Sequence, residues 1–225
     1  MTQGDLFDVA INDETISYSP DDFPHPADIF ELSADAYYAA LYAGMSELPI
    51  KGEISRFVEK VRKAGCTSSD ARSSAARAAS DRGDPDVLVV IKAAGKVLHE
   101  IHRLMGLLRF RQDSGGVYTA RCSPDHFILP ALAEHFTLRF GETPWAIIDE
   151  KRNLCLFREK GGQARLVPLS ASSLSFSAAE DGKKDSWEDL WKLYHRSINN
   201  EAKKNLRLQR QFMPERYHKY LPEKT

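Results

Sequence analysis

The chain lacks the short motifs that most often identify a reaction. Its 225 residues contain no phosphate-binding loop of the GxxxxGK type, no GxGxxG, no HExxH and no CxxC pair. The three cysteines, Cys66, Cys122 and Cys155, are isolated from one another, which excludes a cysteine-rich zinc site and predicts free thiols in a reducing compartment. We therefore predict neither a metal nor a resident cofactor.

Long apolar runs are also missing. No stretch approaches the length needed to cross a bilayer, and the N-terminus lacks the basic region and the apolar region of a secretory signal. Apolar residues make up 42% of the chain and charged residues 28%, which is typical of a soluble globular protein. We expect a cytoplasmic protein without a membrane segment.

Charge is distributed unevenly, although the formal net charge is only −1. Residues 1–35 contain nine acidic residues and no Lys or Arg, whereas residues 192–225 contain nine Lys or Arg and three acidic residues. An excess of positive charge with interleaved aromatic residues suits a surface that binds phosphate. Three arrangements of the acidic head are open: it folds against the basic end, it stays solvated, or it occupies a basic groove as a nucleic-acid mimic.

Apolar spacing predicts helices in the first half of the chain. Prolines break any helix in residues 1–30, which we expect to be irregular or weakly β. Asp84 and Pro85 predict the start of a long helix, and Gly106 predicts its end. Shorter helices are expected over 33–44 and 52–64, the latter closed by Gly65, while 68–80 is either a helix or a connection. The apolar stripe of the long helix is predicted to hold Val87, Ile91, Ala94, Leu98 and Ile101.

The second half of the chain predicts a small sheet. Alternation around Leu108 and Phe110, a Gly-Gly turn and the segment 117–121 indicate a β-hairpin. A helix is expected from Pro124, followed by three short strands at 145–149, 154–157 and 165–169. We predict an α+β fold: a helical N-terminal part, a central ββαβββ unit with one helix covering the sheet, and a helical basic C-terminal arm.

Two domains are expected from these elements. Residues 1–83 form a helical region with the acidic head, and residues 84–225 form the core. Within the core, the Ser/Ala-rich segment 170–184 reads as a linker that leads to the basic arm at 185–222.

The C-terminal helix has an apolar face and a cationic face. The apolar face, which we expect to anchor the helix in the core, holds residues at offsets of three and four: Trp187, Leu190, Trp191, Tyr194 and Ile198. The opposite face holds Lys192, Arg196, Asn199 and Lys203. Two interpretations remain open, namely a phosphate-binding surface and an ordinary amphipathic helix with a solvated basic face.

Histidines give little support for a metal centre. His99 and His102 are three positions apart, which places them on neighbouring faces of a helix, whereas a metal needs three or four converging ligands. A nuclease or a lesion-processing hydrolase remains an alternative, and its candidate residues are His102, Asp125, His126 and His135.

An ordered series of segments is familiar: Glu100–Phe110, Pro124–Pro130, His135–Trp145 and Trp187–Leu221. From about Asp84 to its end, the chain resembles the DUF4130 family of bacterial proteins, which are labelled as DNA repair or DNA metabolism proteins. Members of that family are fused to uracil-DNA glycosylase-like proteins or encoded beside a radical SAM protein. The acidic, proline-broken head and His218, where the family has Trp, depart from its pattern. The resemblance implies a DNA context but no established reaction.

Our leading hypothesis is therefore a DNA-binding accessory factor in repair or modification, which acts with a separate catalytic protein. An alternative is a protein–protein adaptor for a radical SAM or glycosylase protein. Tyr217 and Tyr220 are candidates for stacking on exposed bases, although core packing of at least one of them is expected. The predicted phosphate contacts are Lys192, Arg196, Lys203, Lys204, Arg207, Arg210 and Arg216, with a second cluster of Arg103, Arg109 and Arg111.

Overall fold

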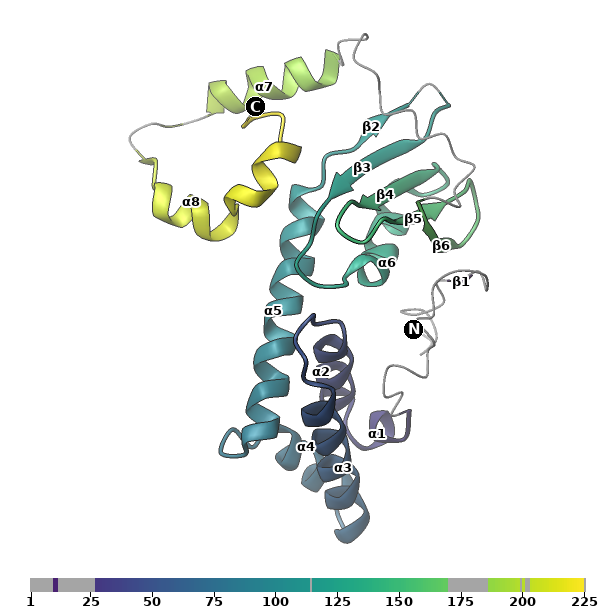
Figure 1. The fold of residues 1–225 in the computed structure, drawn as a ribbon, viewed down its shortest axis with the longest axis vertical. Helices are drawn as coiled ribbons and strands as arrows, with labels where there is room; N and C mark the ends of the chain where they lie inside the picture. The colour runs from purple at the N-terminus through teal and green to yellow at the C-terminus, as the bar shows by residue number, and fades with distance from the viewer. Residues whose placement is uncertain are drawn as a thin grey trace. The chain divides into compact units, whose positions relative to one another are not determined.

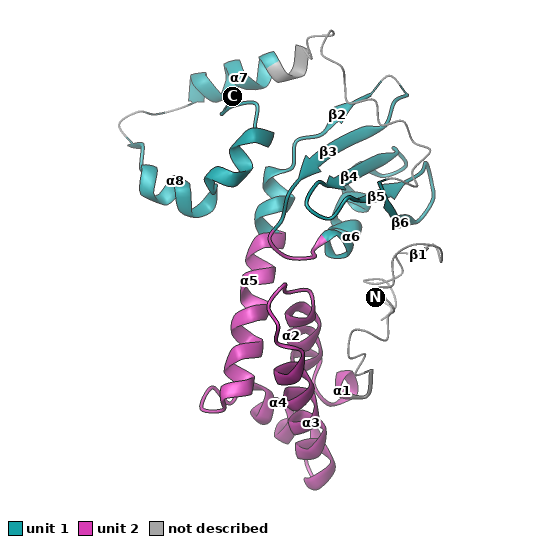
Figure 2. Cartoon of the chain, viewed as in Figure 1, with its two compact units in different colours: residues 1–15, 102–124, 129–225 teal, residues 16–101, 125–128 magenta. Residues whose placement is uncertain are grey.

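Helix α5 (Pro85–Leu107) crosses the boundary between two units of the protein in this computed structural model, coloured separately in Figure 2. The helical unit consists of residues 16–101 and 125–128, and the sheet unit of the remaining residues. The structure describes residues 10–11, 27–113, 115–169, 186–198, 200 and 203–224, so most of the acidic head and the predicted linker lie outside the described residues. The division into domains 1–83 and 84–225 stays a prediction.

Two helices of the helical unit begin with side-chain caps, at Ser33 and Asp70. Ser33 Oγ accepts the N–H of Ala36 at 3.2 Å, and Asp70 Oδ1 accepts the N–H of Ser73 at 3.3 Å. The second cap resolves the alternative left open for residues 68–80, which are helical from Ala71. Besides the first part of α5, the unit contains α1 (Ala27–Leu32), α2 (Ala34–Gly44), α3 (Lys51–Thr67) and α4 (Ala71–Ser80).

Gly65 does not end α3, and the prediction that it would was wrong. The helix continues to Thr67, and a Cβ atom at position 65 would lie 2.8 Å from both Cδ atoms of Leu32 in α1. Glycine is needed here because it lets the backbone of α3 approach the Leu32 side chain.

Asp84 caps the first turn of α5, as the sequence predicts. Asp84 Oδ1 accepts the N–H groups of Asp86 at 2.9 Å and of Val87 at 3.2 Å. Lys60 of α3 pairs with both aspartates, and Arg56 of α3 pairs with Asp86 at 2.9 Å. These hydrogen bonds, with the one from Arg56 the strongest, lower the pKa of Asp86 to about 2.

The buried stripe of α5 differs only in part from the predicted one, since Val87, Ala94 and Ile101 are buried as expected. Val90 and Val97 are fully buried, whereas Leu98, expected in the core, is 43% exposed. The predicted and the observed sets of buried residues both have helical spacing. The helices that pack against α5 therefore determine which set is buried. The helix also continues through Gly106 to Leu107, and Gly106 does not adopt the positive φ of a glycine that ends a helix.

The sheet has the strand order β1-β6-β5-β4-β3-β2. The predicted ββαβββ sequence of elements is confirmed, with β3 and β4 parallel and joined through α6 (Leu129–Phe140). Helix α6 lies against one face of the sheet, over β4, β5 and β6 (Figure 1). The strands are β1 (Ala10–Ile11), β2 (Arg111–Gln112), β3 (Tyr118–Cys122), β4 (Trp145–Asp149), β5 (Leu154–Arg158) and β6 (Ala164–Pro168).

Helix α6 begins at Leu129, five residues later than predicted. The reason is the buried carboxylate of Glu100, which accepts the N–H groups of Asp125 and His126, each at 2.8 Å. The next residue, Phe127, donates its N–H to the carbonyl oxygen of Met45 at 3.0 Å. These partners occupy the backbone of residues 125–127 and keep it out of the helix.

Both faces of the sheet are apolar. Trp145 of β4 is fully buried and packs against Phe136 of α6, with ring centroids 6.2 Å apart. A second buried cluster, with Ile148 and Cys155 at its centre, occupies the opposite face. All five residues of β4 are buried, and so are all five of β5, as in the central strands of a covered sheet.

The C-terminal part of the sheet unit is helical, as predicted. It contains α7 (Ser186–Ile198), α8 (Leu206–Phe212) and the 3-10 helix η3 (Glu215–Tyr220). Among the described residues, no helix is both long and apolar enough to span a membrane.

Candidate nucleic-acid interface

The C-terminal arm, residues 186–224, is attached to the sheet through two carboxylates. At the first, Glu150 Oε2 accepts the Tyr220 hydroxyl at 2.7 Å and the Lys219 ammonium at 3.2 Å, and Arg121 of β3 lies 3.5 Å from Oε1. Tyr217 is 1% exposed beside this contact. Core packing of one of the two candidate stacking tyrosines is therefore confirmed for Tyr217.

The second attachment is Glu223, whose side chain is 2% exposed. Arg109, which follows α5, donates to Glu223 Oε1 at 2.7 Å, and Trp191 of α7 donates its indole N–H to Oε2 at 2.9 Å. The guanidinium of Arg109 also lies 5.3 Å from the centre of the Trp191 ring. One carboxylate thus joins the hairpin region to α7.

Both carboxylates are charged at neutral pH. Burial raises the pKa of Glu150, but hydrogen bonds from Tyr220 and Lys219 outweigh it and leave the pKa below the ordinary value. Glu223 follows the same pattern, with Arg109 as the main opposing partner. Burial raises the pKa of Tyr220 to about 12, so its hydroxyl remains a donor.

The apolar side chains that the structure describes on α7 are not buried, and for them our prediction that this face anchors the helix in the core was wrong. The Trp187 side chain lies outside the described residues. Trp191 is 38% exposed, and Leu190, Tyr194 and Ile198 are more than half exposed. Lys192, predicted on the solvated side, is half-buried. The polar contacts of Trp191 with Glu223 determine how the helix is held, and spacing within α7 gives no sign of that partner.

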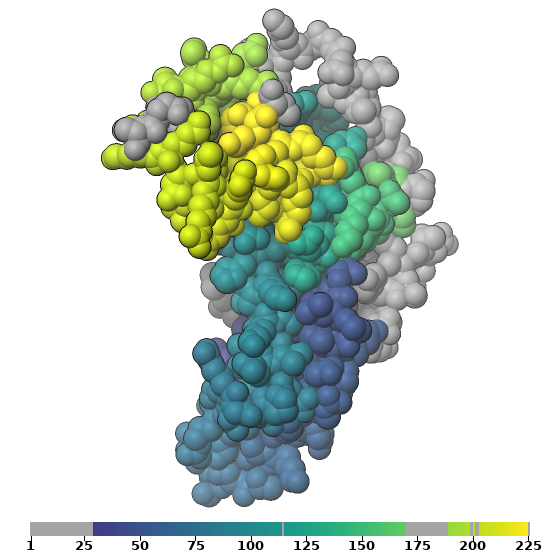
Figure 3. Space-filling model, turned by 60° about the vertical axis from the view of Figure 1, so that its left-hand side comes forward, coloured from purple at the N-terminus to yellow at the C-terminus, as the bar shows by residue number. Residues whose placement is uncertain are grey.

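Most of the predicted phosphate contacts of the arm are exposed. Arg196 lies in the last turn of α7, and Arg207 and Arg210 lie on α8. Arg210 forms an exposed ion pair with Glu215 at 3.1 Å, which contributes little to stability. Figure 3 shows α8 and the C-terminal residues as one continuous part of the surface. The predicted phosphate contacts that are exposed in the arm are Arg196, Lys203, Lys204, Arg207, Arg210 and Arg216.

The second predicted cluster is not arranged as a uniform cationic surface. Arg109 is engaged by Glu223, whereas Arg111 is exposed in β2 and Arg103 is half-buried in α5. The pairing of Arg111 with Thr119 places Arg111 and Arg121 on one face of the hairpin, because residues two apart share a face. Arg121 forms an ion pair with Glu150.

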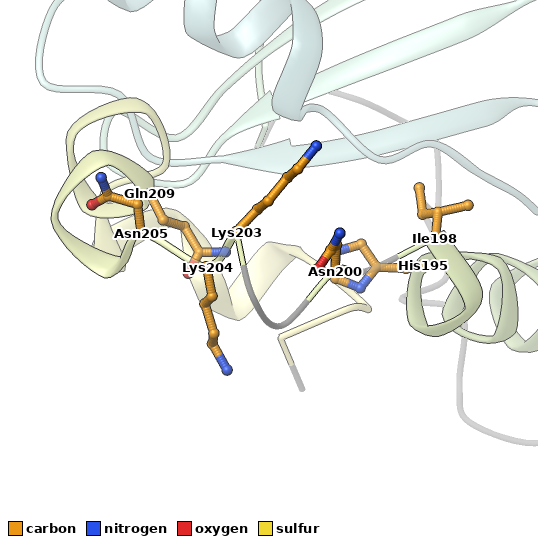
Figure 4. Close-up of a pocket in the computed structure, with 7 residues that line it drawn as sticks. All are labelled: His195, Ile198, Asn200, Lys203, Lys204, Asn205 and Gln209. Atoms are coloured by element: carbon orange, nitrogen blue, oxygen red, sulfur yellow. The ribbon is translucent and has the colours of Figure 1, made fainter.

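An open pocket of about 340 Å³ separates α7 from α8. Figure 4 shows that its lining comes from the end of α7, the connection and α8, and that Lys203 and Lys204 point in different directions. None of the lining residues that the structure describes is acidic, and six of them carry a hydrogen-bond donor. The lining residues are His195, Ile198, Asn200, Lys203, Lys204, Asn205 and Gln209.

The residues of the nuclease alternative are divided between the two units. His102 and His135 belong to the sheet unit, and Asp125 and His126 to the helical unit. His135 packs edge-on against Phe136, and His126 Nδ1 accepts the N–H of Glu47 at 3.4 Å. In the part of the chain that the structure describes, no three His, Cys, Asp or Glu side chains are grouped as metal ligands.

Comparison with known proteins gives one match. The family model for a domain of unknown function, DUF4130, matches residues 66–223, well over half of the chain. The chain belongs to the DUF4130 family. No curated protein and no solved structure matches it.

The DUF4130 match begins in the last turns of α3, earlier than the resemblance from Asp84, and ends at Glu223. It therefore includes strands β2 to β6 of the sheet, both carboxylate attachments and every predicted phosphate contact, but not β1. The sequence did not reveal these attachments because only the positively charged residues of the C-terminal segment were considered as candidates. The available signal was Glu223 itself, one of three acidic residues in a basic segment.

Proposed function

We propose that this DUF4130 protein binds DNA as a cytoplasmic accessory factor in repair or modification, alongside a separate catalytic protein. The binding surface is the C-terminal arm. The free thiols of Cys66, Cys122 and Cys155 agree with a reducing compartment.

The observation that carries this proposal is the set of exposed cations on α7, α8 and their connection, around a pocket whose described lining includes Lys203 and Lys204. Exposed Lys and Arg neutralise phosphates and release counterions, which supplies sequence-independent affinity. Attachment through Glu150 and Glu223 presents these cations on an anchored arm rather than on a free tail.

A salt titration of duplex binding tests the proposal. With four to six phosphate contacts, the slope of log K against log salt is expected at roughly −4 to −5. Replacing Lys203, Lys204 and Arg207 together by Gln should make this slope shallower by roughly 2 to 3. Fluorescence anisotropy at several salt concentrations measures both slopes.

A matched control keeps the total charge change equal. Lys51, Lys63 and Lys96 are exposed on helices of the helical unit, and their triple replacement by Gln removes the same charge outside the arm. This variant should bind like the unchanged protein. Equal weakening by both triple variants would contradict the assignment to the arm, and affinity independent of salt would contradict DNA binding through phosphates.

The exposed apolar residues of the arm favour a second candidate, an adaptor that docks a protein partner. Leu193 of α7 is 63% exposed and Leu208 of α8 is 50% exposed, and exposed apolar surface commonly marks an interface when it forms a large patch. The partner in this candidate is a radical SAM protein or a uracil-DNA glycosylase-like protein. Co-elution with such a protein, lost on replacing Leu193 and Leu208 by Glu, would support the adaptor.

A further inference from the structure

Aromatic rings are exposed among the cations of the arm. Tyr194 on α7 is 52% exposed, and Phe212 at the end of α8 is 63% exposed. In a DNA duplex the faces of the bases are already stacked on one another, so phosphate contacts need no exposed rings. In a single strand the base faces are available, and aromatic side chains beside a basic groove are the usual means of binding them.

The ring of Tyr194 is placed beside a fixed neighbour. Its centroid lies 5.8 Å from that of Trp191, at an interplanar angle of 38°. Trp191 is held in turn by its hydrogen bond to Glu223 and by the guanidinium of Arg109. Two aromatic side chains are thereby ordered before any ligand binds, which reduces the entropy lost on binding.

The pocket continues this surface from α7 to α8. Ile198 lines it and lies four residues after Tyr194, on the same face of the helix. Gln209 lines it from α8 and lies three residues before Phe212, again on a shared face. The described lining supplies ammonium, amide and imidazole groups, and the two lysine charges complement a phosphate backbone.

We propose that the arm prefers single-stranded DNA, with Tyr194 and Phe212 stacking on bases and Lys203, Lys204 and Arg207 contacting the phosphates between them. This inference rests on the proposed function and names its substrate. It moves the stacking role away from the two tyrosines that the sequence suggested, since Tyr217 is buried and the Tyr220 hydroxyl is bonded to Glu150.

The experiment compares a fluorescently labelled oligothymidine with a duplex of equal length, using the full-length protein. The single strand should bind more tightly. Tyr194→Leu and Phe212→Leu keep an apolar side chain but remove the ring, and each should weaken single-strand binding roughly five- to 100-fold, as expected for the loss of one stacked base. Duplex binding should stay within about twofold. Tyr194→Phe should retain single-strand affinity.

A control removes exposed apolar surface elsewhere. Leu138 is 76% exposed on α6, and Leu138→Ala should leave binding of both oligonucleotides unchanged. Circular dichroism of each variant checks that the fold is retained.

The outcomes separate this inference from the function on which it rests. Tighter duplex binding, or equal losses on both oligonucleotides in the ring variants, would overturn the preference for single strands while leaving DNA binding in place. Absence of salt-dependent binding to either oligonucleotide would overturn both. In that case, loss of co-elution with a protein partner in Tyr194→Leu would assign the exposed rings to protein docking.

Discussion

In the sheet, Trp145, Ile147 and Ile148 are fully buried, whereas in the C-terminal arm Tyr194 and Phe212 expose more than half of their side chains. The sheet is held by apolar packing on both faces. The arm is held by two carboxylates that collect hydrogen bonds from Arg, Lys, Tyr and Trp side chains, together with the buried side chains of Tyr217 and Leu221.

These two ways of holding a segment have different consequences. Apolar packing is cooperative and insensitive to pH, and the loss of one large side chain affects the whole core. A charged contact is directional and titrates, so one substitution or a change of pH acts on it locally. We therefore expect the arm to be released under conditions in which the sheet stays folded.

Substitution of tryptophan in each region gives the largest contrast. Trp145→Ala empties a fully buried site and should lower the free energy of unfolding by about 3–5 kcal/mol. Trp191→Ala removes a partly exposed ring and one hydrogen bond to a carboxylate, and should cost about 1–2 kcal/mol. Urea unfolding followed by far-UV circular dichroism measures both. Equal losses would show that the arm is part of the same core.

Removal of the Glu223 carboxylate should release the arm. Glu223→Ala leaves Arg109 and the Trp191 indole without their acceptor, and breaking such a buried pair costs about 2–3 kcal/mol within the arm. Limited proteolysis should then cut within residues 186–224 faster than in the unchanged protein. Glu215→Ala, which breaks an exposed ion pair of the same arm, is the control and should not change the cleavage rate.

Acid should have a smaller and reversible effect of the same kind. The pKa values of Glu150 and Glu223 are depressed in the folded protein, so their stabilisation is present above the ordinary Glu value of 4.5 and is lost as the pH falls through the lower folded values. The rate of cleavage in the arm by an acid-active protease should rise over that range. A Glu150→Gln and Glu223→Gln double variant should show cleavage that no longer depends on pH there.

The smallest effect on stability is expected on the exposed face of α7. Leu193 is 63% exposed, so Leu193→Glu should change the free energy of unfolding by no more than about 0.5 kcal/mol. The same change should raise solubility, because it interrupts an exposed apolar surface. A loss comparable to that of Trp145→Ala would mean that this face is covered in the folded protein.

The sheet could be predicted from the sequence because its signals are local. Strands β4, β5 and β6 are short apolar runs bounded by turn residues, such as Asn153, which adopts a positive φ of 52°, and Gly161, with a φ of 68°. The signal for the start of α5 is equally local, since the side chain of Asp84 accepts the N–H of Val87, three residues later.

The errors have distant causes. Helix α6 starts late because Glu100, 25 residues away from Asp125, takes the backbone donors. The glycine at position 65 is required by the nearby Leu32 side chain. The orientation of α7 depends on the hydrogen bond between Trp191 and Glu223, which lies 32 residues further along the chain. Periodicity within one helix cannot reveal a partner outside it. For the same reason, the sequence indicated that the C-terminal end is cationic but not which rings the arm exposes.

The contact of Glu100 with residues 125 and 126 also affects how the protein can be divided. Residues 125–128 belong to the helical unit and their neighbours to the sheet unit, so the chain changes unit at 124/125 and 128/129 in addition to 15/16 and 101/102. A single cut therefore cannot yield both units intact. A fragment that begins at residue 84 would keep residues 125–128 but lose Met45, whose carbonyl oxygen accepts the N–H of Phe127. Genetic dissection of this protein should therefore rely on point substitutions in the full chain, since shortened versions would confuse loss of function with loss of folding.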